Sequence, residues 1–157
     1  MNEQTRPTFL TQEGYQRLGQ ELNHLRKVRR QQVARRLHAA LAEGDLLENA
    51  ELEDARNEQS FVEGRILTLQ RILGDVIIIE DEGPRESVGL GSCVTVTEGD
   101  GQLETYHIVG SAEADPANGL ISNESPLGQA LMGRRIGDVA EVNAPAGVLA
   151  FKIVEIQ

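Results

Sequence analysis

Apolar residues in the first half of the chain recur every three or four positions, as on one face of an α-helix. They show one slip, near residues 28–33: Tyr15, Leu18, Leu22, Leu25, Val28, Val33, Leu37 and Leu41. Thr11 can accept hydrogen bonds from the first backbone N–H groups of a helix, so the pattern predicts a helix from Thr11 to Glu43. At about 1.5 Å per residue this helix would extend roughly 45 to 50 Å.

A second apolar series with a stricter repeat comes next, at alternating spacings of three and four: Leu52, Ala55, Gln59, Val62, Ile66, Leu69 and Leu73. This is a heptad seam, and Gly74 just beyond it is typical of a helix end. Two long amphipathic helices with a short connection bury their apolar faces against each other, which predicts an antiparallel coiled-coil hairpin. The polar Gln59 would either fix the register of this seam or be a tolerated defect.

Beyond Gly74 the apolar period changes from helical to extended. Alternating or continuous apolar runs predict strands at 76–79, 92–97, 103–109, 139–142 and 148–156. Ser125 and Pro126 begin a short helix that Gly133 closes. We therefore expect an α+β protein, with a coiled-coil hairpin over residues 1–75 and a small antiparallel β domain with one short helix over 76–157. Residues 1–9 are expected to form an unpaired arm.

Net charge is −10, and its distribution excludes some partners. Residues 1–74 hold 11 basic and 11 acidic side chains, whereas residues 75–157 hold 4 and 14. Binding of duplex DNA by the second half is not expected, because its acids would repel phosphate. The chain has no apolar run of 18 residues and no signal-peptide pattern, so we expect a cytoplasmic protein without a membrane partner. The lone Cys93 is expected in a buried strand.

The ten residues between the two helical patterns, here called the tip segment (residues 44–53), begin a cluster of acids. Five acids and no base lie between positions 45 and 54: Asp45, Glu48, Glu51, Glu53 and Asp54. Asp45 and Glu48 are three positions apart and project to the same side. Mg²⁺ typically takes one or two protein carboxylates, so this pair predicts a metal half-site that a partner with further carboxylates and a phosphodiester completes. The alternative is a solvated helix end whose acids complement the helix dipole.

Positive charge is concentrated on the first helix, at six positions with no acid between 26 and 36: Arg26, Lys27, Arg29, Arg30, Arg35 and Arg36. This run indicates either a contact for a polyanion or an acidic groove, or a solvated helix face. The histidines show no ligand spacing, and neither a nucleophile elbow nor a phosphate loop is found. Independent enzymatic activity is therefore not expected.

Residues 44–51, GDLLENAE, closely resemble the tip signature GDLxENAEY of the bacterial transcript cleavage factors GreA and GreB. Further similar segments cover nearly the whole chain: 28–30, 58–59, 63–66, 106–110, 113–115, 121–122, 125–131 and 137–138. The chain is identified as a member of the GreA/GreB family, closer to its GreA branch because the basic surface is moderate.

The resemblance implies a transcription elongation factor that inserts its coiled coil into the secondary channel of bacterial RNA polymerase and stimulates cleavage of backtracked nascent RNA. Asp45 and Glu48 would be the catalytic acids that hold a shared Mg²⁺ only in the complex, while polymerase does the chemistry. The expected contacts with RNA or polymerase are Arg29, Arg30, Arg35, Arg36, Asn49 and Glu51. The FKBP-like second domain would dock on polymerase through Ser125, Pro126, Leu127 and Gly128. The resemblance favours a monomer, although a heptad seam alone permits self-association.

Two positions depart from the family pattern, and they keep other functions open. Leu52 stands where the family often has Tyr, and Leu47 occupies a position that is usually polar. The first alternative is a Gre-like paralogue that binds the same channel and inhibits or regulates polymerase without promoting cleavage. The second is a coiled-coil interaction module unrelated to transcription. Prolyl isomerase activity is a third, which the scarcity of aromatic residues in residues 75–157 argues against.

Overall fold

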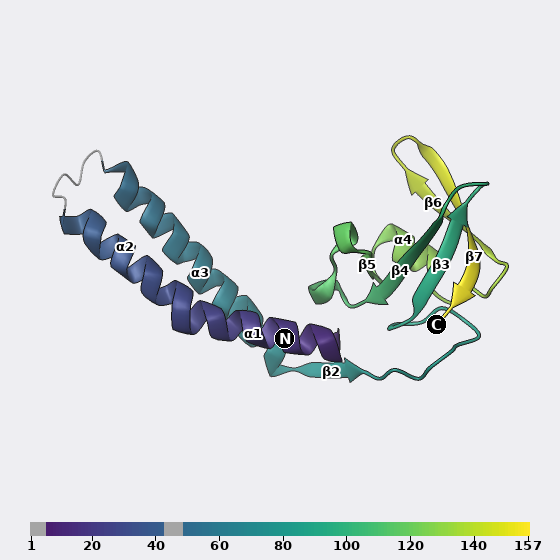
Figure 1. The fold of residues 1–157 in the computed structure, drawn as a ribbon, viewed down its shortest axis with the longest axis horizontal. Helices are drawn as coiled ribbons and strands as arrows, with labels where there is room; N and C mark the ends of the chain where they lie inside the picture. The colour runs from purple at the N-terminus through teal and green to yellow at the C-terminus, as the bar shows by residue number, and fades with distance from the viewer. Residues whose placement is uncertain (1–5, 43–48) are drawn as a thin grey trace, which may run out of the picture. The chain divides into compact units, whose positions relative to one another are not determined.

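The computed structural model describes residues 6–42 and 49–157, which form two units. The hairpin unit comprises Tyr15–Asp75, and the sheet unit combines Met1–Gly14 with Val76–Gln157. Each unit can be followed by its colours in Figure 1. Contacts therefore group the start of the chain with its second half.

The hairpin unit consists of two long helical arms that run antiparallel (Figure 1). The first arm is built from α1 (Gln12–His24), the π-helical turn η1 (Leu25–Arg29) and α2 (Arg30–Ala42), which succeed one another directly. The second arm is α3 (Ala50–Gly74), which packs against α2 and η1. The predicted helical hairpin is confirmed; Glu43, its predicted first-arm end, lies outside the described residues.

The slip in the apolar pattern near residues 28–33 coincides with the π-helical turn. A π turn holds more residues than an α turn, so the apolar face resumes at a later position than a regular helix predicts. Leu25 is buried at the start of the turn and Val33 is buried after it, whereas Val28, within the turn, is 39% exposed. The expectation that Val28 belongs to the apolar stripe is therefore wrong.

The seam of α3 has the predicted repeat except at one position. Its buried members are Leu52, Ala55, Val62, Ile66 and Leu69, whereas Leu73 is half-buried. Gln59 is exposed, so it neither fixes the register nor interrupts the core. The neighbouring Glu58 is half-buried instead and accepts hydrogen bonds from arginines of the first arm.

The sheet unit contains a curled five-stranded sheet in the order β5-β4-β3-β7-β6. Strands β3 (Cys93–Glu98), β4 (Leu103–Val109), β6 (Val139–Ala144) and β7 (Gly147–Ile156) pair antiparallel and lie where the sequence predicts strands. The fifth strand, β5 (Leu120–Ser122), was not predicted and runs parallel to β4. The sheet is therefore mixed rather than wholly antiparallel.

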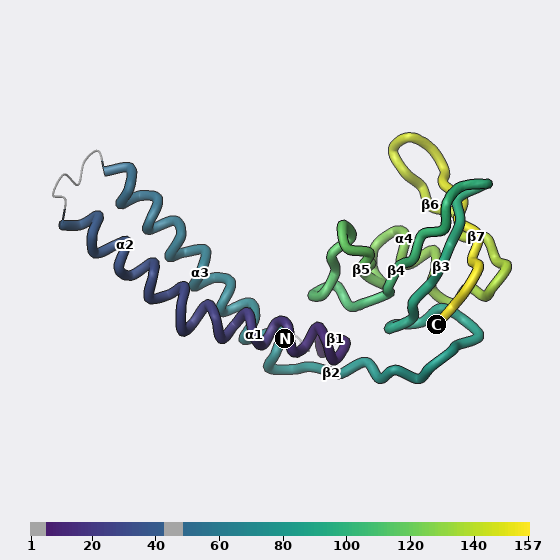
Figure 2. The backbone as a smooth tube through the Cα atoms, viewed as in Figure 1, coloured from purple at the N-terminus to yellow at the C-terminus, as the bar shows by residue number. Residues whose placement is uncertain are grey.

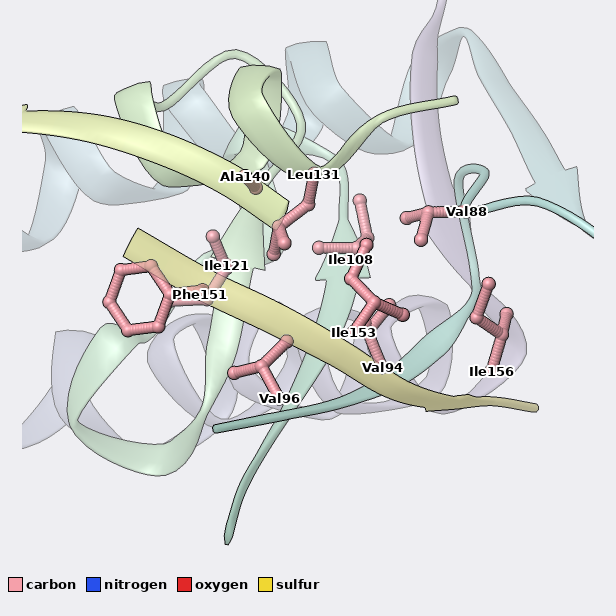
Figure 3. Packing of buried hydrophobic residues seen from close by; sticks show 10 residues of the cluster. All are labelled: Val88, Val94, Val96, Ile108, Ile121, Leu131, Ala140, Phe151, Ile153 and Ile156. Atoms are coloured by element: carbon pink, nitrogen blue, oxygen red, sulfur yellow. The ribbon is translucent and has the colours of Figure 1, made fainter. Parts of the chain in front are cut away.

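One apolar cluster lies inside this curled sheet, as Figure 3 shows. Its ten buried members come from the strands, the loops beside them and α4 (Pro126–Leu131): Val88, Val94, Val96, Ile108, Ile121, Leu131, Ala140, Phe151, Ile153 and Ile156. Helix α4 packs against β5 and β6, and its Leu131 is fully buried. The predicted single short helix is confirmed.

Thr8 and Phe9 are paired, contrary to the unpaired arm expected over residues 1–9, of which residues 1–5 lie outside the described residues. Strand β1 (Thr8–Thr11) pairs in parallel with β2 (Val76–Ile79), and the two can be traced side by side in Figure 2.

Two short 3₁₀ turns, η2 (Ser111–Glu113) and η3 (Pro116–Asn118), come after β4. None of the described helices is both long and apolar enough to cross a membrane.

Candidate functional site

Asn49 joins the ends of α2 and α3. Its side-chain oxygen caps α3 by accepting a hydrogen bond from Leu52 N at 3.1 Å. Its side-chain Nδ2 donates to the backbone carbonyl oxygen of Ala40, on α2, at 2.8 Å. Both polar atoms of this side chain, predicted to contact RNA or polymerase, are thus engaged within the chain.

The two predicted catalytic acids, Asp45 and Glu48, lie outside the described residues, so their role stays a prediction. Glu51 lies in the first turn of α3, and its carboxylate accepts a hydrogen bond from Arg36 Nε at 2.5 Å. This hydrogen bond and the positive charge of Arg36 lower the pKa of Glu51. Glu51 is therefore a partner of Arg36 across the hairpin.

Arginines of the first arm pair with acids of α3. Glu58 accepts hydrogen bonds from Arg29 and, at 2.7 Å, from Arg36, so that one carboxylate bridges two cations. Arg36 also pairs with Glu51, which extends the chain of charges to a fourth residue. The hydrogen bonds that Arg36 donates to Glu51 and Glu58 raise the pKa of Arg36.

A separate ion pair lies further along the arms. Arg30 donates two hydrogen bonds to Glu63, at 2.7 and 2.8 Å, in the bidentate geometry that arginine and carboxylate favour. These bonds raise the pKa of Arg30 and lower that of Glu63. Of the predicted contact arginines, Arg29, Arg30 and Arg36 are paired within the hairpin, whereas Arg35 is exposed with no ion pair seen to a described residue.

Leu52 lies inside the hairpin. Its side chain is 4% exposed and belongs to the buried seam of α3. The departure from the tyrosine of the family pattern is therefore a packing change within this hairpin. Leu47, the other departure, lies outside the described residues.

The predicted docking residues form the start of α4. Ser125 caps this helix by accepting a hydrogen bond from Gly128 N at 3.1 Å, and it donates to Ser122 O at 2.7 Å. A Cβ atom on Gly128 would overlap the Ser122 carbonyl oxygen, so this turn requires glycine. Pro126 is exposed, and Leu127 packs partly against the core. A polymerase-docking role for the four residues stays a prediction.

Sequence reasoning missed Glu113, a buried residue of η2 whose carboxylate contacts the start of α1. It is 4% exposed and accepts hydrogen bonds from the hydroxyl of Thr11 and, at 3.0 Å, from Thr11 N. Thr11 in turn caps α1, because its hydroxyl oxygen accepts from Gly14 N at 3.0 Å. A Cβ atom on Gly14 would overlap the Glu113 carboxylate. The sequence signal for this contact was Gly14 itself, because glycine lowers helix stability and its presence in a predicted helix suggests close packing.

A cleft of about 570 Å³ lies in the sheet unit beside β1. Its lining comes from three separate parts of this unit: Arg6, Pro7, Thr8, Phe9, Gly110, Ser111, Ala112, Asn123 and Glu124. A Cβ atom on Gly110 would overlap the carbonyl oxygen of Phe9, so β1 approaches the end of β4 closely. No sequence pattern indicated this cleft, because its walls are far apart along the chain.

Cys93 shows no sign of a reactive thiol. It is half-buried in β3, with its Sγ atom 3.6 Å from Nε2 of His107. Burial raises the pKa of the thiol, and the negative charge of Glu155 raises it further. A raised pKa keeps the thiol protonated and poorly nucleophilic at neutral pH.

No group of three or more His, Cys, Asp or Glu side chains within residues 6–42 and 49–157 is arranged to hold a metal ion. Glu51, the acid nearest in sequence to residues 43–48 among the described residues, is paired with Arg36 through Oε1. The carboxylates expected to hold Mg²⁺ remain those of Asp45 and Glu48, whose oxygen atoms are the ligands that this ion prefers.

Comparison with known proteins places both parts of the chain in one family. The family described as "Transcription elongation factor, N-terminal" matches residues 8–78, and "Transcription elongation factor, GreA/GreB, C-term" matches residues 83–157. Transcription elongation factor GreA of Thermoanaerobacter pseudethanolicus is 46% identical over 155 residues, covering 98% of this chain and 99% of the relative. GreA of Bacillus subtilis is 47% identical over 148 residues, covering 94% of each.

Among solved structures, the GreA factor homolog 1 (Gfh1) of Thermus thermophilus is 34% identical, covers 97% of this chain and 99% of its own, and has a TM-score of 0.45. The relatives named GreA match the chain over nearly its full length, at an identity that shows common descent. The chain therefore belongs to the GreA/GreB family and is a transcription elongation factor of the GreA type.

Proposed function

We propose that this protein inserts its hairpin into the secondary channel of bacterial RNA polymerase and stimulates Mg²⁺-dependent cleavage of backtracked nascent RNA, which rescues arrested complexes. The observation that carries the proposal is the place of GDLLENAE in the chain. In sequence, residues 43–48 join α2 to α3, so Asp45 and Glu48 belong to the connection between the two arms.

The length and the surface of the hairpin support insertion. From Gln12 to Ala42 the first arm is helical throughout, and at about 1.5 Å per residue it extends roughly 45 Å. The apolar seams of the two arms are buried against each other, so the surface of this rod is mostly polar, although Phe61 and Leu67 of α3 are exposed. Such a rod can enter a water-filled channel without exposing its core.

Asp45 and Glu48 would hold Mg²⁺ together with carboxylates of polymerase and phosphate oxygens of RNA. The ion would activate water and stabilise charge at the cleaved phosphodiester. Polymerase performs the phosphodiester chemistry in this scheme, so the chain is an activator and not itself an enzyme. Arg35 would remain available to RNA phosphates, since no described acid is paired with it.

We propose that the protein acts as a monomer, in a one-to-one complex with polymerase, and that Ser125–Gly128 contact polymerase outside the channel. Burial of the heptad seam within the hairpin supports the monomer. Its residues on α3 are buried by the first arm and are not available to a second chain. The docking segment is supported by the exposed Pro126 at a turn that Ser125 and Gly128 hold rigid.

The test is RNA cleavage in a purified, backtracked elongation complex with Mg²⁺, comparing the wild-type chain with Asp45→Ala and Glu48→Ala. Loss of a metal ligand should reduce stimulated cleavage at least as much as the roughly 10- to 100-fold loss that removal of an outer-shell partner causes. The matched controls are Asp54→Ala and Glu53→Ala, which remove the same charges from exposed positions of α3 and should retain cleavage.

Binding is measured in the same complexes by competition for the channel. If wild type accelerates cleavage and both tip variants lose it while still competing, the half-site proposal holds. If wild type binds but slows transcription without cleavage, the protein is a regulatory paralogue, and Leu47 is the departure to revert. Absence of binding to polymerase would contradict both functions.

A further inference from the structure

Asn49 uses the two ends of one side-chain amide on two different helices. The acceptor oxygen satisfies Leu52 N at the start of α3, and the donor nitrogen satisfies Ala40 O near the end of α2. The first N–H groups and last carbonyl groups of a helix lack partners within the helix. One side chain therefore satisfies one such group at each helix end.

This bridge lies directly over the last described layer of the hairpin core. Ala40 is 2% exposed, and Leu52 is also buried, so the two residues that Asn49 joins are themselves fixed by packing. Close by along α3, the Arg36–Glu51 pair forms a second link between the arms. The ends of α2 and α3 are thus held at a defined separation by two independent contacts.

We infer that Asn49 is a positioning residue for Asp45 and Glu48. By joining Ala40 to α3, it fixes the separation of the two helix ends between which the acids lie in sequence. The inference rests on the proposed function, in which these two acids must meet a metal ion at the polymerase active centre. It replaces the expectation from the family resemblance that Asn49 itself contacts RNA or polymerase.

Helix capping alone does not account for Asn49. Ser, Asp and Thr also cap helices, with similar or slightly lower preference. An aspartate of the same shape would accept the hydrogen bond from Leu52 N, but it has no donor for Ala40 O. The donor half of the amide is therefore what distinguishes a bridge from a cap, and Asn49→Asp removes that half alone.

The first experiment compares wild type, Asn49→Asp and Asn49→Ser in the backtracked complex over a range of factor concentrations. Asn49→Ser also retains a capping oxygen and adds no charge, so it controls for the negative charge of aspartate. We expect both variants to lower the cleavage rate at saturating factor roughly three- to tenfold, as for the loss of one net hydrogen bond. The concentration that gives half-maximal cleavage should not change.

A control variant separates positioning from a general loss of hairpin stability. Glu21→Gln breaks the ion pair between Glu21 and Arg65, at 2.6 Å, which joins α1 to α3 far along the arms from Asn49. It should leave the saturating rate unchanged. If Asn49 variants raise the half-maximal concentration instead and leave the rate intact, Asn49 is a contact residue and the inference is overturned.

The second experiment does not depend on cleavage. Nitroxide labels are attached to Leu41→Cys and Ala50→Cys, both exposed, in a Cys93→Ser background, and the distribution of distances between them is measured. The distribution should be narrow with Asn49 and broader with Asn49→Asp. If the distance distribution has the same width in wild type and Asn49→Asp, the inference is overturned, whatever the cleavage assay gives. If the distribution broadens in Asn49→Asp, the bridge is supported even when wild type does not stimulate cleavage.

Discussion

The hairpin unit and the sheet unit are held together in different ways. The arms of the hairpin meet along one apolar seam, and charged pairs such as Arg30–Glu63 and Arg65–Glu21 link them on the outside. The sheet unit instead encloses a ten-residue apolar cluster, and its glycines at positions 110 and 128 allow backbone segments to approach closely. Exposed ion pairs contribute little stability, typically about 0.2 to 1 kcal/mol each. The hairpin therefore combines a narrow apolar seam with weak exposed ion pairs, whereas the sheet unit depends on closely packed apolar volume.

The sheet unit should be the more sensitive of the two to loss of apolar volume. Ile108→Ala, at a fully buried position of the cluster, should lower the free energy of unfolding by about 2 to 5 kcal/mol. Urea unfolding would measure the loss in free energy, and amide hydrogen exchange would show in which unit it occurs. Leu22→Ala in the hairpin is the matched comparison, and its loss should be smaller because Leu22 is 9% exposed. Equal losses at the two sites would contradict the distinction.

Close backbone approach in the sheet unit predicts a cost for adding a single methyl group. Gly110→Ala would push the carbonyl oxygen of Phe9 away and displace β1, so we expect a loss of about 1 to 3 kcal/mol, the range for overpacking. The measurement is the urea midpoint, with exchange of the β1 and β2 amides as the local readout. Retention of full protection in β1 would show that this contact is less tight than the structure indicates.

The same substitution in the hairpin should have the opposite sign. Gly64 lies within α3, where a Cβ atom would meet no other atom within 4 Å. Gly64→Ala should therefore stabilise the hairpin by about 0.5 to 1 kcal/mol, because glycine loses more backbone entropy in a helix than alanine. Thermal unfolding monitored by circular dichroism would test it. If Gly64→Ala is more stable yet less active with polymerase, glycine is needed at this position because a partner lies close to the backbone there.

Acid should weaken the hairpin through its ion pairs. The hydrogen bonds from Arg36 and Arg30 lower the pKa of Glu51 and Glu63 below the ordinary value of 4.5. The folded state then binds fewer protons than the unfolded state in this range, so stability is present above pH 4.5 and is lost as the pH falls through the folded pKa. Exchange of α2 and α3 amides between about pH 6 and pH 3, corrected for intrinsic rates, would report it. A Glu51→Gln, Glu63→Gln double variant should show a flatter profile.

The regular elements could be predicted because each leaves a period in the sequence. The heptads of α3 and the alternation of β3 locate those elements, and the slip before Val33 marks the π turn. Strands β1 and β5 could not be found in this way. Strand β1 has four residues, and its parallel partner β2 is distant in the sequence. Strand β5 has three residues, and the segment that joins it to its parallel partner β4 has no apolar repeat.

Side-chain pairing was less predictable than the elements. The run from Arg26 to Arg36 indicated a surface for a polyanion, but the period of one helix does not give its register against another. Only the register shows that Glu58 lies between Arg29 and Arg36, or that Asn49 reaches Ala40. Glu113 was missed for the same reason, since its partner Thr11 is 102 positions away. The metal-binding role of Asp45 and Glu48 rests on their spacing and the family resemblance.

The π turn has a consequence for insertions and deletions. A π turn holds one residue more than the same length of α-helix, so it absorbs that residue without rotating the helix beyond it. If residues 25–29 became α-helical instead, α2 would turn by about 100°, and Gln32 would replace Val33 in the seam. Removing one residue within the turn would leave the downstream face in place. A single-residue gap should therefore be tolerated at this point of the arm, whereas the same gap in α3 would misalign every layer beyond it.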